Sequence, residues 1–189
     1  TPTLSIRNPR LWWPYQLGKP ELYRLQLAFK AGGRVSDRAT VQFGIRDIRS
    51  RLNSHGARVF RINGRDLLIR GSTWSPDLLH GRSRTADETH LAYLKNMNLN
   101  AVRLEGSLAS DHFWDLCDRE GILVLNGLPC CNHWENWKDW KEEDMQVARE
   151  SVRGALLTAR NHPCHMGYLL GSDFPPPERV EREYLDVIE

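Results

Sequence analysis

The chain has 189 residues, 40% of them hydrophobic and 26% charged, which is ordinary for a folded globular protein. Residues 1–70 carry fourteen Lys and Arg against four Asp and Glu, whereas residues 71–189 carry twelve against twenty. The basic residues lie at strand-like spacing without a basic helix or an aromatic RNA-binding motif, so nucleic-acid binding is not predicted. No apolar run approaches the roughly 20 residues of a membrane helix, so no membrane span is predicted either.

The first part of the chain predicts antiparallel strands. Residues 22–29 (LYRLQLAF) and 38–45 (RATVQFGI) alternate between apolar and polar side chains on either side of a Gly-Gly turn, a pattern typical of a β-sandwich. Asn63-Gly64 lies between two further alternating segments and is a strong hairpin signal. The second arm of that hairpin, residues 66–71 (DLLIRG), is almost continuously apolar, as in a strand that enters a covered sheet.

From that strand onward, a strand is followed by a helix four times. The first helix is predicted to open at Thr85, with Glu88 completing a capping box, and to bury Leu91, Leu94 and Met97. The other units pair residues 100–106 with a helix from Ser110 to Gly121, 122–127 with a helix over 142–160, and 165–173 with a helix over 177–188. Four such units predict a parallel sheet.

Two architectures contain such a sheet: a doubly wound sheet and half of a (β/α)8 barrel. The turn after the first strand (RGSTWSPDLLHG) has neither a GxGxxG nor a Walker motif, so nucleotide binding is not predicted. A barrel displays polar side chains just beyond the carboxyl ends of its strands. Four such residues fall there: Asp77, Arg103, Glu105 and Asp173. We therefore predict an α/β fold, the first half of a (β/α)8 TIM barrel preceded by part of a β-sandwich.

Asp173 is the leading candidate for a catalytic side chain. It follows Leu169 and Leu170 and precedes Phe174, so we expect its carboxyl group to be partly desolvated, which favours the protonated form. A carboxylic acid that stays protonated near neutral pH can donate a proton to a leaving group, as the general acid does in glycoside cleavage. The alternative is that Asp173 caps the next helix or closes the loop.

The other charged candidates are weaker. Arg103 and Glu105 share one face of a strand, so they either form a structural ion pair or line a pocket together. Asp77 lies in a Ser-Pro-Asp segment, which is also a common turn.

Tryptophans are the remaining candidates, because an aromatic face can stack on a sugar. Trp74 follows the first parallel strand, and Trp134, Trp137 and Trp140 follow the third. The spacing of three also predicts a helical turn packed on the barrel. We expect two of these three to pack, and we keep Trp134 as a substrate-binding candidate.

The cysteines do not predict a metal site or a disulfide framework. Cys130 and Cys131 precede His133, and Cys164 precedes His165, but no CxxC spacing occurs. Adjacent residues of a strand point to opposite faces, so such pairs chelate poorly. We expect buried thiols, and neither a metal nor an organic cofactor.

Several of these segments together resemble glycoside hydrolase family 2, and within it the exo-β-D-glucosaminidases. The resemblance rests on NPRLWWP and FGIRDI in the sandwich, on INGRDLLIRG, NAVRLEG and RNHPCHMGYLLGSD in the barrel, on SPDL, and on the paired cysteines. Most of the family ends the fourth barrel strand with Asn-Glu, whereas the glucosaminidase branch has Ser-Asp, as here at Ser172-Asp173. The resemblance implies part of an immunoglobulin-like sandwich over residues 1–50 and the N-terminal half of the catalytic barrel over residues 51–189.

The resemblance also implies roles for single residues. Asp173 becomes the general acid and base, and Asp77, Arg103 and Glu105 line the subsite of the terminal sugar. The branch has Trp-Glu before the paired cysteines, and that Glu helps to recognise the substrate amine, whereas this chain has Leu128-Pro129. The departure leaves the sugar specificity open.

The expected function is therefore that of a retaining exo-glycosidase segment that acts on terminal β-linked glucosamine of chitosan or its oligosaccharides. The first residues are typical of the interior of a longer protein, so we expect the chain to be a segment of one. The resemblance places the nucleophilic carboxylate on a strand beyond Glu189, so we expect that the chain alone does not hydrolyse substrate. The alternatives are a β-mannosidase or another family 2 activity, and a non-catalytic carbohydrate-binding module. Localisation and oligomeric state stay open, with an extracellular parent protein favoured.

Overall fold

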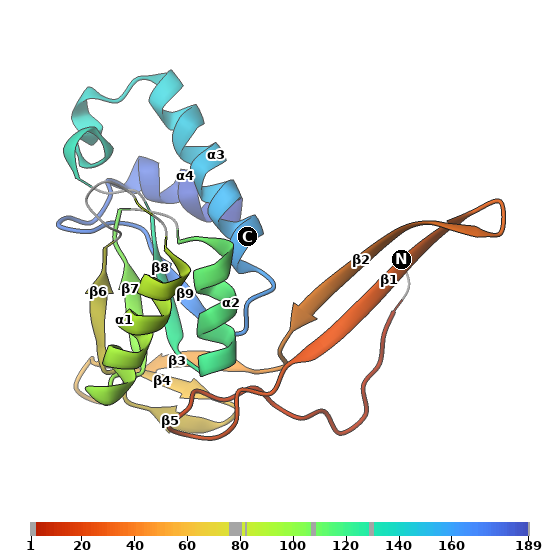
Figure 1. The fold of residues 1–189 in the computed structure, drawn as a ribbon. Coiled ribbons are helices and arrows are strands. Elements are labelled where there is room, and N and C mark those ends of the chain that lie inside the picture. The colour runs from red at the N-terminus through yellow and green to blue at the C-terminus, as the bar shows by residue number, and fades with distance from the viewer. Residues whose placement is uncertain (1–2, 76–80, 82, 107–108, 129–130, 189) are drawn as a thin grey trace.

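The computed structural model describes residues 3–75, 81, 83–106, 109–128 and 131–188. Its N-terminal part contains a long antiparallel hairpin of β1 (Tyr23–Ala31) and β2 (Arg34–Phe43) that projects from the rest of the chain (Figure 1). The turn is made by Gly32 and Gly33 at φ +57° and +78°, a backbone conformation that glycine adopts without steric cost. The predicted strands and their Gly-Gly turn are therefore confirmed.

A small antiparallel sheet follows, formed by β3 (Ile48–Leu52), β4 (Arg58–Ile62) and β5 (Arg65–Leu67). The hairpin predicted at Asn63-Gly64 is confirmed, since Ile62 pairs with Arg65 across a two-residue turn in which both φ angles are positive. In Figure 1 this sheet lies beneath the lower ends of the parallel strands. The predicted domain boundary at residues 50 and 51 falls inside β3.

The single strand predicted over residues 66–71 is wrong, because the chain forms two strands there. β5 ends at Leu67, and the first parallel strand, β6 (Gly71–Trp74), begins four residues later. Asn100 holds the bend between them, since its side chain accepts a hydrogen bond from the Arg70 N–H (2.9 Å) and donates one to the Leu68 carbonyl (2.9 Å). The bend lets the chain leave an antiparallel sheet and enter a parallel one.

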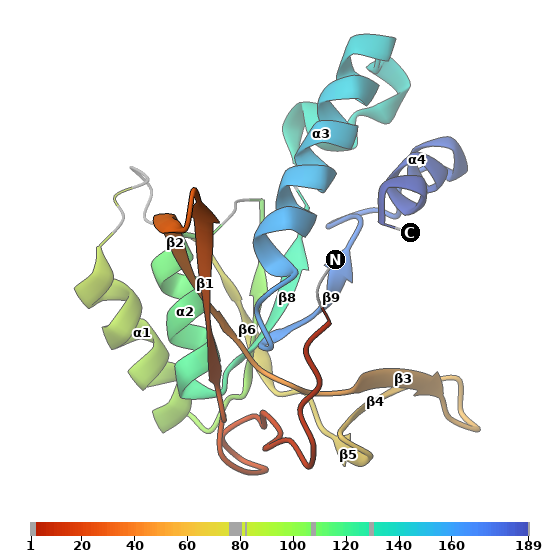
Figure 2. The same cartoon turned by 90° about the vertical axis from the view of Figure 1, so that its right-hand side faces the viewer.

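The parallel sheet has the order β6-β7-β8-β9, with β7 (Ala101–Leu104), β8 (Leu123–Gly127) and β9 (His165–Leu169). Helices α1 (Arg84–Asn96) and α2 (Asp111–Glu120) cover one face of β6 to β8 (Figures 1 and 2). Val102 and Val124 are paired in register and fully buried on that face. Thr73, Arg103 and Leu125 alternate with the buried residues, so they lie on the opposite face, where they are partly or fully exposed.

The helix signals of the sequence are largely confirmed. Ser110 caps α2 through its side chain, and Gly121 ends it in the left-handed conformation at φ +68°. The predicted start of α1 at Thr85, with a capping box completed by Glu88, is wrong, because the helix begins at Arg84 and is capped by Ser83, whose hydroxyl accepts from the Ala86 N–H (3.3 Å). Met97 does not join the buried stripe of α1, because it follows the last helical residue and is 61% exposed.

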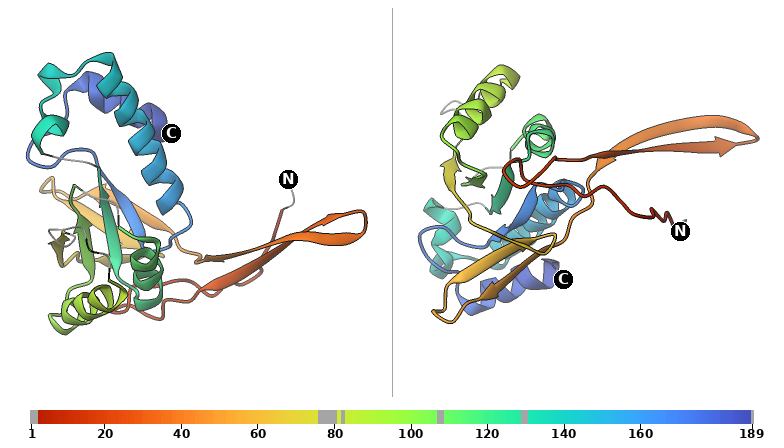
Figure 3. Two further views of the ribbon diagram at one scale, coloured as in Figure 1. Left: turned by 45° about the horizontal axis from the view of Figure 1, so that its top comes forward. Right: turned by 90° about the horizontal axis from the view of Figure 1, so that it is seen from below.

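The segment after β8 builds a second layer. It contains two short 3-10 helices, η1 (Asn132–Glu135) and η2 (Trp137–Asp139), and then α3 (Glu142–Ala159). After β9 the chain ends in α4 (Glu178–Ile188), which lies beside α3 in Figures 1 and 3. Trp137, Trp140, Met145, Val180 and Tyr184 are buried together between these elements. None of the helices in the described ranges has the length and apolar character required to cross a membrane.

Candidate active site

The candidate active site lies at the edge of the sheet where the parallel strands end. β7 ends at Leu104 and is followed by Glu105, and β9 ends at Leu169 and is followed closely by Ser172 and Asp173. β7 and β9 are not neighbours, because β8 lies between them. The residues that follow the strands therefore have to reach across β8 to meet.

Arg103, Glu105 and Ser172 meet there through their side chains. The Arg103 Nη2 atom donates a hydrogen bond to the Ser172 Oγ atom (2.7 Å), and that hydroxyl donates to the Glu105 Oε1 atom (3.1 Å). The Arg103 Nη1 atom also lies 3.4 Å from the Glu105 Oε1 atom. Of the two alternatives for Arg103 and Glu105, the structure shows the ion pair, and their role in binding a ligand stays a prediction. Ser172 is the third member of this network, and the sequence alone did not single out its side chain.

A second carboxylate, that of Glu135, holds the backbone of the same loop. Its Oε1 atom accepts hydrogen bonds from the N–H groups of Ser172 (2.9 Å) and Asp173 (3.1 Å). Its Oε2 atom accepts from the N–H of Cys131 (3.2 Å), which precedes η1. The sequence reasoning missed Glu135, although it follows Trp134 in the loop after a parallel strand, where a carboxylate is worth noting.

Asp173 lies beside this network with its side chain exposed. The expected partial desolvation of Asp173 is wrong for the described part of the chain, because Asp173 is exposed and its neighbour Phe174 is itself 65% exposed. The position of Asp173 at the carboxyl end of β9 is as predicted, and its role stays a prediction.

The remaining predicted site residues are Asp77 and the tryptophans. Asp77 lies outside the described residues. Trp137 and Trp140 are 8% and 7% exposed, which confirms that two of the three tryptophans pack, whereas Trp134 is only partly buried and meets Trp140 edge to face at 6.0 Å. Trp74 packs against the Phe113 ring, with 4.6 Å between the ring centroids. Trp134 and Trp74, the last residue of β6, are both partly buried, so each keeps some exposed surface.

Leu128, the first residue of the departure from the glucosaminidase pattern, is a core residue. It is 4% exposed, and its N–H extends the β8–β9 ladder by donating to the Leu169 carbonyl (3.1 Å). Its side chain belongs to the apolar cluster of the second layer. The second residue of the departure, Pro129, lies outside the described residues.

The cysteines that the structure describes have separate environments. Cys117 and Cys164 are fully buried, and burial raises the pKa of each thiol because apolar surroundings disfavour the thiolate. The expected burial is wrong for Cys131, which is exposed, and Cys130 lies outside the described residues. Buried Asp118 accepts from the Cys164 N–H (3.0 Å) and pairs with the His162 Nδ1 atom (2.7 Å), so both of its carboxylate oxygens are used in linking α2 to the loop before β9.

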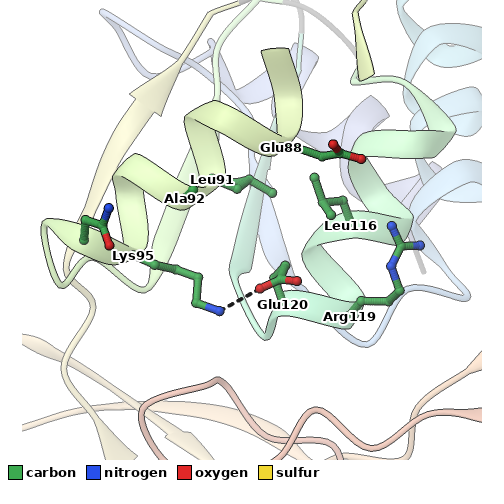
Figure 4. Close-up of a pocket in the computed structure, with 8 residues that line it drawn as sticks. Glu88, Leu91, Ala92, Lys95, Leu116, Arg119 and Glu120 are labelled. Carbon is green, nitrogen blue, oxygen red and sulfur yellow. Dashed lines mark hydrogen bonds and ion pairs between the residues drawn. The ribbon is translucent and has the colours of Figure 1, made fainter. Parts of the chain in front are cut away.

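A pocket of about 500 Å³ lies elsewhere, between α1 and α2 (Figure 4). An ion pair between the Lys95 Nζ atom and the Glu120 Oε2 atom (2.6 Å) crosses it. The lining residues come from the two helices and from none of the strand ends: Glu88, Leu91, Ala92, Lys95, Asn96, Leu116, Arg119 and Glu120. This pocket is therefore separate from the candidate active site.

Comparison with known proteins identifies the family to which the chain belongs. The family model described as "Glycosyl hydrolases family 2" matches residues 1–46. An exo-β-D-glucosaminidase of Streptomyces avermitilis is 42% identical over 196 aligned residues, which cover 100% of this chain and 22% of that protein. The exo-chitosanase CsxA of Amycolatopsis orientalis superposes with a TM-score of 0.90 at 38% identity, over 97% of this chain and 22% of that one.

A more distant structure is the β-D-mannosidase of Dictyoglomus thermophilum. It superposes with a TM-score of 0.74 at 26% identity, over 89% of this chain and 21% of that one. The chain thus spans about a fifth of the length of the relatives that it matches. A parallel βα sheet with charged side chains gathered at its carboxyl edge, together with these relatives, defines part of a glycoside hydrolase. The chain belongs to glycoside hydrolase family 2, and within it resembles the exo-β-D-glucosaminidases.

Proposed function

We propose that the chain forms the N-terminal half of a (β/α)8 catalytic barrel and part of an immunoglobulin-like sandwich, with the boundary near residue 50. Two features of the sheet support the half-barrel. Helices α1 and α2 cover only one of its faces, while the face that carries Arg103 and Leu125 lines a pocket of about 230 Å³. Strand β9 is also an edge strand, and a fifth strand would pair with it in a complete barrel.

The proposed parent protein is a retaining exo-glycosidase that removes terminal β-linked glucosamine from chitosan or chito-oligosaccharides. The protonated carboxyl of Asp173 gives its proton to the glycosidic oxygen as a carboxylate from a later strand attacks the anomeric carbon. The Asp173 carboxylate then takes a proton from the water that cleaves the glycosyl–enzyme intermediate. Arg103 and Glu105, with Asp77 and Trp134, line the subsite of the terminal sugar.

The observation that carries this proposal is the place of Ser172-Asp173. The pair follows β9, and the Ser172 side chain is hydrogen-bonded to Arg103 of β7 and to Glu105, which follows β7. The proposed general acid therefore adjoins charged groups that can bind the hydroxyl and amino groups of a sugar. No metal or organic cofactor enters the proposed reaction. The acidic excess of residues 71–189 suits a cationic substrate.

A β-mannosidase or another family 2 glycosidase is the second candidate, favoured by Leu128-Pro129 in place of the Trp-Glu of the glucosaminidase branch. The two are separated by rates of the full-length protein on aryl β-glucosaminide, β-mannoside and β-galactoside. We expect the glucosaminide to have the highest kcat/KM. A mannoside preference would overturn the substrate assignment, and sugar binding without hydrolysis would indicate a carbohydrate-binding module instead.

A further inference from the structure

The segment that carries Asp173 has no regular secondary structure. Between β9, which ends at Leu169, and α4, which begins at Glu178, the chain forms bends. Gly171 turns tightly, since a Cβ atom there would lie 2.3 Å from the Phe174 carbonyl oxygen. No strand ladder or helix therefore fixes the direction in which the Asp173 side chain leaves the backbone.

Glu135 supplies that missing constraint. One oxygen of its carboxylate accepts from two successive backbone N–H groups, those of Ser172 (2.9 Å) and Asp173 (3.1 Å). These two N–H groups have no other acceptor among the residues that the structure describes. Hydrogen bonds to an ionised acceptor are roughly twice as strong as neutral ones, and two donors on one oxygen define the orientation of both peptide planes.

The carboxylate is itself anchored. Glu135 is the last residue of η1 and is partly buried, and its second oxygen accepts from the Cys131 N–H (3.2 Å) just before that helix. The adjoining Trp134 meets Trp140 edge to face, and Trp140 is part of the buried second layer. Through Glu135, the loop after β8 therefore sets the position of the loop after β9.

We propose that Glu135 is a positioning residue for proton transfer by Asp173. This rests on the proposed function, in which Asp173 is the general acid. Glu135 acts on the backbone of Asp173, whereas Arg103 and Glu105 act on the Ser172 side chain. Loss of the Glu135 carboxylate leaves Asp173 chemically intact but free to point away from the glycosidic oxygen. Misplacement of a catalytic group by about 1 Å can lower a rate roughly 100-fold.

The test uses the full-length enzyme with Glu135→Gln, Glu135→Ala and the control Glu143→Gln, an exposed glutamate in the first turn of α3. The value of kcat/KM is measured on a chito-oligosaccharide, whose leaving group requires a proton, and on dinitrophenyl β-glucosaminide, whose leaving group does not. For Glu135→Ala we expect a loss of about 10- to 100-fold on the oligosaccharide and less than about 3-fold on the aryl substrate. Glu135→Gln is expected between Ala and the native enzyme, since its amide oxygen still accepts but carries no charge.

Because both substrates are measured on one enzyme sample, their ratio is independent of the fraction that is folded. An equal loss on both substrates, or no loss on either, would overturn the proposal. Asp173→Asn is measured in parallel, so that a failure of the proposed role of Asp173 can be distinguished from a failure of the proposed role of Glu135. If Asp173→Asn affects the two substrates equally, the proposed function fails. If Asp173→Asn lowers kcat/KM more on the oligosaccharide than on the aryl substrate and the Glu135 variants do not, only the proposed role of Glu135 is wrong.

Discussion

His165, the first residue of β9, is expected to make the fold sensitive to acid. Its ring lies against that of Tyr168 (4.4 Å between centroids), and its Nε2 atom is buried without a partner among the described residues. Burial, and then the positive charge of Arg46, lower the pKa of His165 from 6.5 to about 4. The folded protein therefore disfavours the imidazolium form that the unfolded chain readily adopts.

The sign of the effect follows from proton binding. Above pH 6.5 the imidazole is neutral in both states and contributes no pH dependence. Between pH 6.5 and about 4 the unfolded state binds a proton and the folded state does not, so the free energy of unfolding falls as the pH falls. A difference of about 2.5 pKa units at 1.36 kcal/mol each gives roughly 3 kcal/mol.

The assay is urea unfolding of the native protein, of His165→Gln and of the control His55→Gln at pH 7 and pH 4. His55 is exposed in the turn between β3 and β4, so its replacement removes a histidine without removing a buried one. We expect His165→Gln to lose roughly 3 kcal/mol less than the native protein on acidification, and His55→Gln to lose as much as the native protein. If all three proteins lose the same free energy of unfolding between pH 7 and pH 4, His165 is not the cause of the acid sensitivity.

Three further substitutions test the fold. Gly121→Ala should lower the free energy of unfolding by more than about 1–2 kcal/mol, because φ is +68° and a Cβ atom would meet a backbone nitrogen at 2.6 Å. Gly154→Ala, in open space within α3, should raise it by about 0.5–1 kcal/mol, and a thermal melt distinguishes the two signs. Asp118→Ala should lower the free energy of unfolding by roughly 3–5 kcal/mol, measured by urea titration, because it leaves the buried Cys164 N–H and the His162 ring without their acceptor. A decrease of less than about 1 kcal/mol would contradict this.

Local signals in the sequence predicted the local structure well. Ser110 and Gly121 delimit α2 because capping depends on one side chain and one backbone conformation, both visible in sequence. Asn63-Gly64 predicted its hairpin for the same reason. The alternation of strands and helices was sufficient to predict an α/β fold with a parallel sheet.

Features that depend on residues distant in sequence were not predictable in the same way. The division of residues 66–71 between two strands depends on the side chain of Asn100, some thirty residues away. Glu135 acquires its place only when β8 and β9 become neighbours, because its partners lie 37 and 38 residues further along the chain. The exposure of Asp173 likewise depends on what surrounds the strand end and not on the apolar residues before it in the chain.

The role of Asp173 as general acid is tested by a substitution at that position in the full-length protein. Asp173→Asn is compared with the native enzyme on a chito-oligosaccharide and on dinitrophenyl β-glucosaminide, using kcat/KM, which reports formation of the covalent intermediate. With the acid removed, kcat/KM is expected to fall about 100- to 10,000-fold on the oligosaccharide and little on the aryl substrate, whose leaving group departs without a proton. Undiminished hydrolysis of the oligosaccharide by Asp173→Asn would contradict the account.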